Sequence, residues 1–262
     1  MRPSLRKCFV LLFLCSAQNL IAMYNGNPSA PMMPEQSIFF THSWFSLKSG
    51  YEFDNVFDRK LKMESHHLHA KDNKYTSRGQ FGVLTLVLCD RVEFYSGLGS
   101  LQSNLTQKID EERIRYDLDR HFAWSIGGRA LFAYWGDLQF GLTASYLHFF
   151  PDLHSISIIR KLFPKDDAEL QYHEWQVGAG FSYHIWWLFP YAGVVYSNAQ
   201  ARFMHLKSLQ SFFPKNKFTL ESEKHYGIIV GLGLAPEIGF AVNVEGRFID
   251  ETALTVSADV RF

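Results

Sequence analysis

The chain has 262 residues, and its 26 basic and 26 acidic side chains give a formal net charge of zero at pH 7. This balance argues against a nucleic-acid partner, because such partners usually require a basic protein surface. The chain also contains 24 Phe, 12 Tyr and 6 Trp. That abundance suits a membrane barrel, which needs two aromatic girdles as well as an apolar outer band.

The first 22 residues have the pattern of a secretory signal peptide. Its basic n-region consists of Arg2, Arg6 and Lys7. A short apolar stretch follows over residues 8–15, and Ala22 is a suitable last residue before cleavage. We therefore expect a signal peptide over residues 1–22 and a mature chain, beginning near Met23, over residues 23–262.

Cys8 and Cys15 leave with the signal peptide, so Cys89 alone remains and no disulfide is expected within one mature chain. Whether Cys89 pairs with a second chain is left open. Lipoprotein processing at Cys15 is a weaker alternative, because the bulky Leu14 precedes it where a small residue is expected. The richest later apolar run, residues 185–196, is interrupted by Pro190 and is shorter than the roughly 18 residues of a membrane helix.

Alternation of apolar and polar residues predicts eleven strands, at 45–53, 56–63, 80–89, 92–101, 121–135, 138–150, 172–184, 194–201, 226–234, 240–248 and 253–262. Bacterial single-chain barrels have even strand numbers. We therefore expect about twelve strands, with a further strand near residues 32–42, and a range of ten to sixteen stays open.

The final ten residues show the pattern most clearly. Leu254, Val256 and Val260 share one face, and Thr255 shares the other with Ser257, Asp259 and Arg261. Such a strand fits either a tilted membrane strand or the edge of a soluble sandwich. The polar faces of the predicted strands favour the membrane barrel, because they are rich in Gly, Ser, Thr and Gln rather than in long charged residues.

Connection lengths alternate along the predicted strands. Short turns are expected at Asp54, Asp90, Gly136, 185–189 and 235–238, and long polar stretches fill 65–78, 102–120, 151–170 and 204–224. Short periplasmic turns and longer extracellular loops are typical of transmembrane antiparallel β-barrels of the outer membrane. The closing aromatic residue, Phe262, is also typical of such barrels and is the candidate assembly signal.

No catalytic, cofactor or metal site is predicted. His66, His67 and His69 cluster in a loop without a defined set of further ligands. His173 and Glu174 lie on opposite faces of one strand, as do Ser145 and His148. Gly231 and Gly233 lack the third glycine and the helix of a dinucleotide loop.

The candidate functional residues are instead charged side chains on the polar faces. The predicted pore-lining residues are Lys48, Glu52, Arg129, Glu174, Glu245, Arg247, Asp259 and Arg261. Mixed charge would pass small hydrated solutes without strong ion preference. The alternative is that these residues pair across strands and fill the lumen.

Several segments resemble the major outer membrane porin of chlamydiae. They are GNPSAP (26–31), GYEFDNVFDRKLK (50–62), FAWSIGGRALF (122–132), YHEWQVGAGFSY (172–183), FPYAGVVYSNA (189–199) and EGRFIDETALTVSADVRF (245–262). The resemblance implies a surface-exposed, trimeric porin in contact with outer-membrane lipid. This chain is shorter in its loops and poorer in cysteine than that family.

Two functions are therefore expected as alternatives. The first is passive diffusion of small hydrophilic solutes and ions through the barrel. The second is a plugged barrel with a structural role, or with an adhesive role in which the loops bind a host partner. Solute preference and oligomeric state are not predicted from the residues themselves.

Overall fold

The computed structural model describes residues 26–32, 44–63, 70–109, 112–158, 161–163, 169–204, 217–236 and 239–262. The predicted signal peptide lies outside these residues. So does the predicted strand near 32–42, except for Met32, which ends a short 3₁₀ helix, η1 (Ala30–Met32). Within the described residues, no helix is long and apolar enough to cross a membrane.

The described strands are β1 (Phe45–Met63), β2 (Ala70–Leu88), β3 (Val92–Ile109), β4 (Glu112–Leu118), β5 (His121–Trp135), β6 (Leu138–Phe149), β7 (Leu153–Ile158), β8 (Lys161–Phe163), β9 (Glu169–Tyr183), β10 (Leu188–Met204), β11 (Phe218–Ser222), β12 (Tyr226–Leu234), β13 (Phe240–Phe248) and β14 (Glu251–Arg261). All of their pairings are antiparallel. The fold class expected from the sequence is confirmed.

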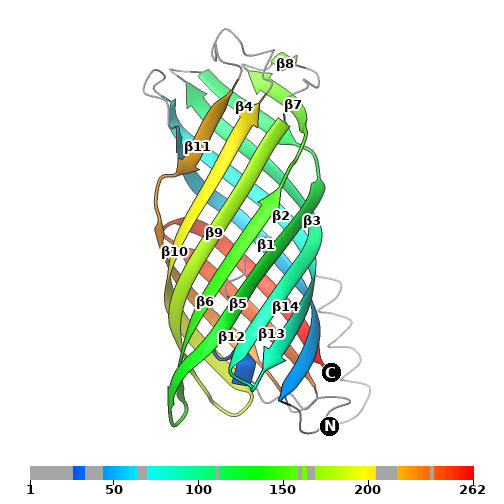
Figure 1. Cartoon of the computed structure of the whole chain (residues 1–262). Helices are drawn as coiled ribbons and strands as arrows, with labels where there is room; N and C mark the ends of the chain where they lie inside the picture. Colours follow the sequence, from blue (N-terminus) through cyan, green and yellow to red (C-terminus); the bar gives the residue numbers. More distant parts are fainter. Residues whose placement is uncertain are drawn as a thin grey trace, which may run out of the picture.

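Ten strands close the barrel, in the order β1, β2, β3, β5, β6, β9, β10, β12, β13, β14 and back to β1 (Figure 1). The four other strands extend one end of the wall. β4 pairs with the upper half of β3, β7 with β4, and β8 with β7, whereas β11 lies between β1 and β10. The ring is thus at the lower limit of the expected range and below the expected twelve.

The predicted turn at Asp54 is wrong, because β1 runs through it. A β-bulge between Val56 and Asp58 shifts the pairing of β1 with β14. A bulge inserts one extra residue and so reverses which residues face inward. Two stretches of opposite phase therefore resembled two short strands.

The outer surface of the ring has the composition of a lipid-facing surface. Exposed residues in the middle of the strands include Leu84, Leu98, Ile126, Val194 and Val230. Exposed aromatic residues near the short-turn end include Phe45, Trp135, Tyr183, Trp186, Trp187 and Phe240, and those near the other end include Phe57, Phe122, Phe150, Tyr226 and Phe248. An apolar band between two aromatic girdles is the pattern that a bilayer imposes.

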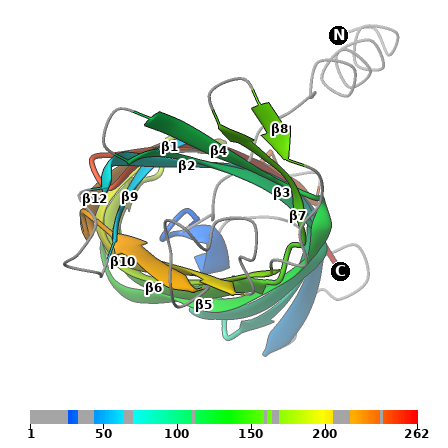
Figure 2. The same cartoon turned by 90° about the horizontal axis from the view of Figure 1, so that it is seen from above.

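The short connections, such as Cys89–Arg91 and Gly136–Asp137, lie at the end that carries the C-terminus, and the strand extension lies at the other end (Figure 1). Since periplasmic turns are short in these barrels, the first end is assigned to the periplasm and the extension to the cell exterior. Seen along the axis, η1 lies inside the ring (Figure 2). The interior of the barrel is therefore the place to look for a functional site.

Candidate functional site: the barrel lumen

Five of the predicted pore-lining residues are buried inside the ring: Lys48, Arg129, Glu174, Glu245 and Arg247. Glu52 is half-buried and lines an internal cavity. Asp259 is half-buried on the inward face of β14, where the charges of Lys48 and Arg129 act on it. That these residues line a conducting pore stays a prediction.

Arg261 is half-buried at the end of β14. It lies at the periplasmic rim, where its guanidinium contacts the carboxylate of Asp90 in the turn between β2 and β3. Its Nε also donates to Ser46 Oγ at 2.9 Å. Arg261, the last inward-facing residue of β14, therefore lies at the periplasmic rim, because the strand ends there.

A chain of charges crosses the periplasmic half of the lumen. Lys48 Nζ on β1 lies 3.1 Å from Glu93 Oε1 on β3, and Arg129 Nη1 on β5 lies 3.0 Å from Glu93 Oε2. The Arg129 guanidinium also lies over the Tyr95 ring, 4.6 Å from its centroid. One carboxylate thus links two cations from strands on either side of it.

A second ionic network occupies the middle of the lumen. Arg247 Nη2 lies 3.1 Å from Asp54 Oδ1, and Arg247 Nε lies 3.1 Å from Glu251 Oε1. Thr255 Oγ1 donates to the same oxygen of Asp54 at 2.5 Å. These groups come from three neighbouring strands, β13, β14 and β1, and they are buried.

Arg59 extends this network across the barrel. Its Nη2 lies 2.8 Å from Glu251 Oε2, and its Nη1 contacts Glu174 on β9, on the opposite side of the ring. Tyr172 Oη accepts a hydrogen bond from Arg59 Nη1 at 3.0 Å and donates to Glu174 at 2.7 Å. A continuous series of alternating charges therefore spans the lumen from wall to wall.

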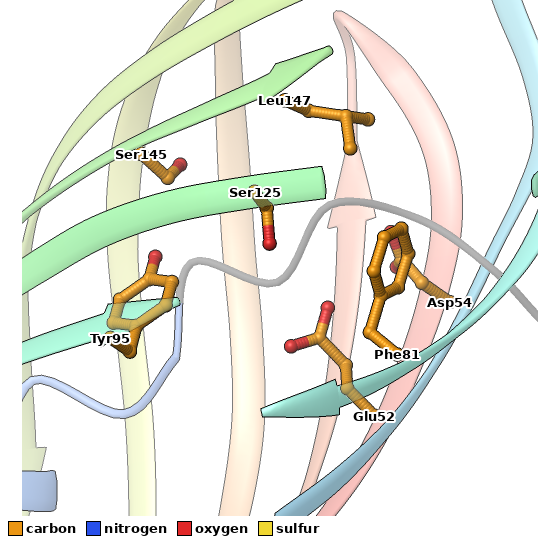
Figure 3. Close-up of a pocket in the computed structure, with 7 residues that line it drawn as sticks. All are labelled: Glu52, Asp54, Phe81, Tyr95, Ser125, Ser145 and Leu147. Carbon is orange, nitrogen blue, oxygen red and sulfur yellow. The ribbon is translucent and has the colours of Figure 1, made fainter. Parts of the chain in front are cut away.

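A small cavity of about 10 Å³, room for about one water molecule, remains between the periplasmic and middle networks. Its lining residues are Glu52, Asp54, Phe81, Tyr95, Ser125, Ser145 and Leu147 (Figure 3). The carboxylates of Glu52 and Asp54 approach it from one side, and the hydroxyls of Ser125 and Ser145 from another (Figure 3).

Apolar side chains fill the extracellular half of the lumen. The buried cluster comprises Leu61, Tyr75, Phe81, Leu101, Leu105, Ile114, Tyr116, Leu118, Ala123, Leu147, Phe149, Leu153, Ile156, Leu170, Tyr172, Ala199, Ala201, Phe203, Phe218 and Leu220. Tyr116 on β4 and Phe203 on β10 have ring centroids 5.3 Å apart. The Tyr75 ring on β2 stacks on Tyr172 of β9 at 5.0 Å. Both contacts join non-neighbouring strands across the lumen.

Several inward glycines make room for these large side chains. A Cβ at Gly127 would lie 2.3 Å from Tyr95 Oη, and a Cβ at Gly231 would lie 2.2 Å from Tyr191 Cζ. The absent side chains leave space that aromatic rings from adjacent strands occupy.

Sequence reasoning missed four residues of the ionic networks: Asp54, Arg59, Glu93 and Glu251. Two were detectable, because the alternation of β14 continues back to Glu251 and that of β3 begins with Glu93 opposite Phe94. Arg59 had no such signal, because the bulge before it reverses the pattern.

The residues that were considered as catalytic or metal-binding groups and rejected lie on both faces of the barrel wall. Ser145 is buried inside, whereas His148 on the outer face packs against Trp124 and Phe150. His66, His67 and His69 lie outside the described residues. Among residues that are described, no group of His, Cys, Asp or Glu is arranged to hold a metal ion.

A closed antiparallel ring with an apolar belt and two aromatic girdles defines an outer-membrane β-barrel. The family model for the Chlamydia major outer membrane protein matches residues 161–210. Two Chlamydia trachomatis proteins, the major outer membrane porins of serovars D and B, are 23% and 22% identical to this chain over 393 and 394 residues, and the alignments cover 100% of each chain. The predicted resemblance is confirmed: this chain is similar along its length to the chlamydial major outer membrane porins.

Two solved barrels are also similar to this chain. The translocator domain of the autotransporter NalP from Neisseria meningitidis is 13% identical, with 86% of this chain and 91% of that chain covered and a TM-score of 0.45. The outer membrane protease OmpT from Escherichia coli is 13% identical, with 83% and 92% covered and a TM-score of 0.40.

Proposed function

We propose that this protein is a closed barrel with a structural and surface-presenting role in the outer membrane. The observation that carries the proposal is the apolar cluster that fills the extracellular half of the lumen. Ions and hydrophilic solutes would lose their hydration there, and apolar constrictions block conduction by excluding water. A closed lumen therefore fits this interior better than a diffusion pore does.

The size of the ring supports the same conclusion. Eight strands leave an interior that side chains just fill, whereas sixteen to eighteen leave an aqueous channel. Ten strands are close to the first case, and side chains such as Tyr75 and Tyr172 stack across the remaining width. The wall itself thus favours a filled barrel.

The extension formed by β4, β7, β8 and β11 is the part that the barrel would display at the cell surface. Charged residues such as Arg113 and Arg115 are exposed on the outer face of β4, and Ile114 and Tyr116 are buried on its inner face. A packed inner face holds this surface in a fixed shape, which suits recognition. A host partner and a trimeric assembly stay predictions.

Passive diffusion of small hydrophilic solutes and ions is the second candidate. It is supported by the names of the relatives, which are porins, and by the mixed charges of the periplasmic half of the lumen. The apolar cluster would have to open for this function. An enzymatic role is not proposed, because the buried cations Lys48, Arg59, Arg129 and Arg247 are each paired with a carboxylate.

Liposome swelling with sugars of graded size separates the two candidates. Purified barrel, with folding verified by its heat-dependent electrophoretic mobility, is reconstituted beside an open porin and beside lipid alone. The closed barrel is expected to swell no faster than lipid alone, even with the smallest sugar. Swelling that falls with sugar size would establish diffusion and overturn the structural proposal.

A further inference from the structure

The segment Gly26–Met32 lies inside the periplasmic end of the ring (Figure 2, blue). Residues 26–31 are all buried, although they belong to no strand of the barrel. They follow closely on the predicted cleavage site, so they would form the start of the mature chain. A buried peptide that takes no part in the sheet needs an explanation.

The sequence of the segment folds it into a compact turn. Asn followed by Pro favours a turn, because the Asn side chain bonds to the backbone two residues on and Pro fixes its own φ. Ser29 N donates to Asn27 Oδ1 at 2.9 Å, and Ala30 N donates to Asn27 O at 2.9 Å. The segment therefore satisfies part of its own backbone before it meets the wall.

Polar groups of the wall hold both ends of this turn. Gly26 N donates to Glu245 Oε2 on β13 at 3.0 Å, and Tyr191 Oη on β10 donates to the same oxygen at 3.1 Å. Lys48 Nζ on β1 donates to Ala30 O at 3.0 Å. Two of the ring's strands, β13 and β1, thus supply side chains that bind backbone groups of the segment, and Tyr191 on β10 binds one of these side chains, Glu245.

The wall is also shaped to fit the segment. A Cβ at Gly141 would lie 2.9 Å from Pro28 Cβ, and a Cβ at Gly180 would lie 3.1 Å from Pro28 Cγ. Conversely, a Cβ at Gly26 would lie 2.3 Å from Arg129 Nε. The wall has glycines where Pro28 of the segment approaches it, and the segment has a glycine where Arg129 of the wall approaches it.

An apolar contact completes the docking. Ala30 packs with Phe189, Ala235 and Ala241 in a buried cluster separate from the large one in the extracellular half. Small side chains on both partners bring the backbones close together, as expected for an evolved fit between a peptide and its groove.

We propose that the periplasmic mouth of the barrel is a peptide-binding site, occupied by the chain's own segment Gly26–Met32, and that this segment is a removable plug. No ring pairing includes the segment, since β1 and β14 close the barrel without it. Its release would open the periplasmic half of the lumen and leave the apolar cluster of the extracellular half unchanged. The proposal is therefore independent of whether the barrel conducts.

The direct test supplies the segment as a separate peptide. A barrel that lacks residues 23–32 is refolded, and a synthetic peptide of residues 23–32 is titrated into it by calorimetry in detergent. One peptide should bind per truncated barrel. Its affinity for the full mature barrel should be lower by a factor of about ten or more, because that site is already occupied. Absence of saturable binding to the folded, truncated barrel would overturn the proposal.

Two altered peptides provide matched controls without changing the barrel. Gly26→Val should weaken binding about tenfold or more, because its side chain meets Arg129 and because Gly26 has a φ of +83°. Ser29→Ala should bind as well as the parent, because it keeps the backbone donor and removes a hydroxyl that lacks a partner among the described residues. Equal weakening by both changes would contradict the proposed geometry.

A measurement in the full chain covers the case in which the truncated barrel does not fold. Ser257→Cys, in a background with Cys89→Ser, places one thiol on the inward face of β14. Adding Gly26→Val should speed its reaction with a charged thiol reagent about tenfold, whereas adding Ser29→Ala should not. An unchanged rate with Gly26→Val would show that the segment does not cover this part of the lumen.

Discussion

Arg59 on β1 and Glu174 on β9 form an ion pair across the lumen, although their strands lie on opposite sides of the ring. Arg59 also contacts Glu251 on β14, which in turn contacts Arg247. The pair is buried, so its charges have no access to bulk water. The two halves of the wall are therefore tied together electrostatically as well as by the sheet.

Removal of Arg59 is the first prediction. Arg59→Met would leave Glu174 and Glu251 as buried carboxylates that have lost a positive partner. Breaking one side of a buried ion pair costs about 3–5 kcal/mol, so the free energy of unfolding should fall by that amount. Urea unfolding in lipid vesicles, followed by tryptophan fluorescence, measures the change.

Lys74→Met is the matched control, on the neighbouring strand β2. Lys74 Nζ lies 3.9 Å from Asp58 Oδ2, and both side chains are exposed. Exposed pairs contribute about 0–1 kcal/mol. Similar losses in the two variants would show that Arg59 is not buried as described.

The second prediction concerns the space that Gly231 leaves for Tyr191. Gly231→Ala would place a methyl group on the Tyr191 ring, and overpacking typically costs about 1–3 kcal/mol. In a Tyr191→Ala background the same change should cost much less, because the ring is gone. A double-mutant cycle of unfolding free energies therefore measures the contact directly.

Gly82→Ala serves as the control for this cycle. Gly82 faces outward, and the nearest atom to an added Cβ is Leu98 O at 3.9 Å, an ordinary contact. Its effect should be small and independent of Tyr191. If Gly231→Ala cost the same with and without Tyr191, the ring would not occupy that space.

The third prediction tests the lipid-facing side of the wall. Val230 lies at the centre of β12 on the exposed apolar face. Val230→Arg should lower the unfolding free energy by about 2–4 kcal/mol, as expected for a cation at the bilayer midplane. Thr252→Arg, which points outward near the extracellular end of β14, should cost about 0–1 kcal/mol. Equal losses of unfolding free energy in the two variants would show that Val230 does not lie at the bilayer midplane.

Alternation allowed the membrane-spanning strands to be predicted well. In β14, Thr255 and Ser257 are buried inside and Ala258 is exposed outside, as expected. Lipid requires an apolar outer face at every second position, and this requirement leaves a regular signal in the sequence. Most of the ring and of its inward charges could therefore be predicted.

The extension was predicted as loop, for a physical reason. In β4, Ile114, Tyr116 and Leu118 alternate with Arg113, Arg115 and Asp117, so the period of two is present. Its outer face lies beyond the membrane and is charged rather than apolar, so the strand lacks the lipid signature. Contacts between distant strands, such as Arg59 with Glu174, could not be predicted, because they depend on how the ring closes.

Single-channel recording in planar bilayers tests the central claim, a lumen closed by its own side chains, most directly. Folded protein, inserted at defined density, should give no discrete current steps, and a barrel without residues 23–32 should be equally silent because the apolar cluster is unchanged. Reproducible steps from correctly folded full-length protein would contradict the account.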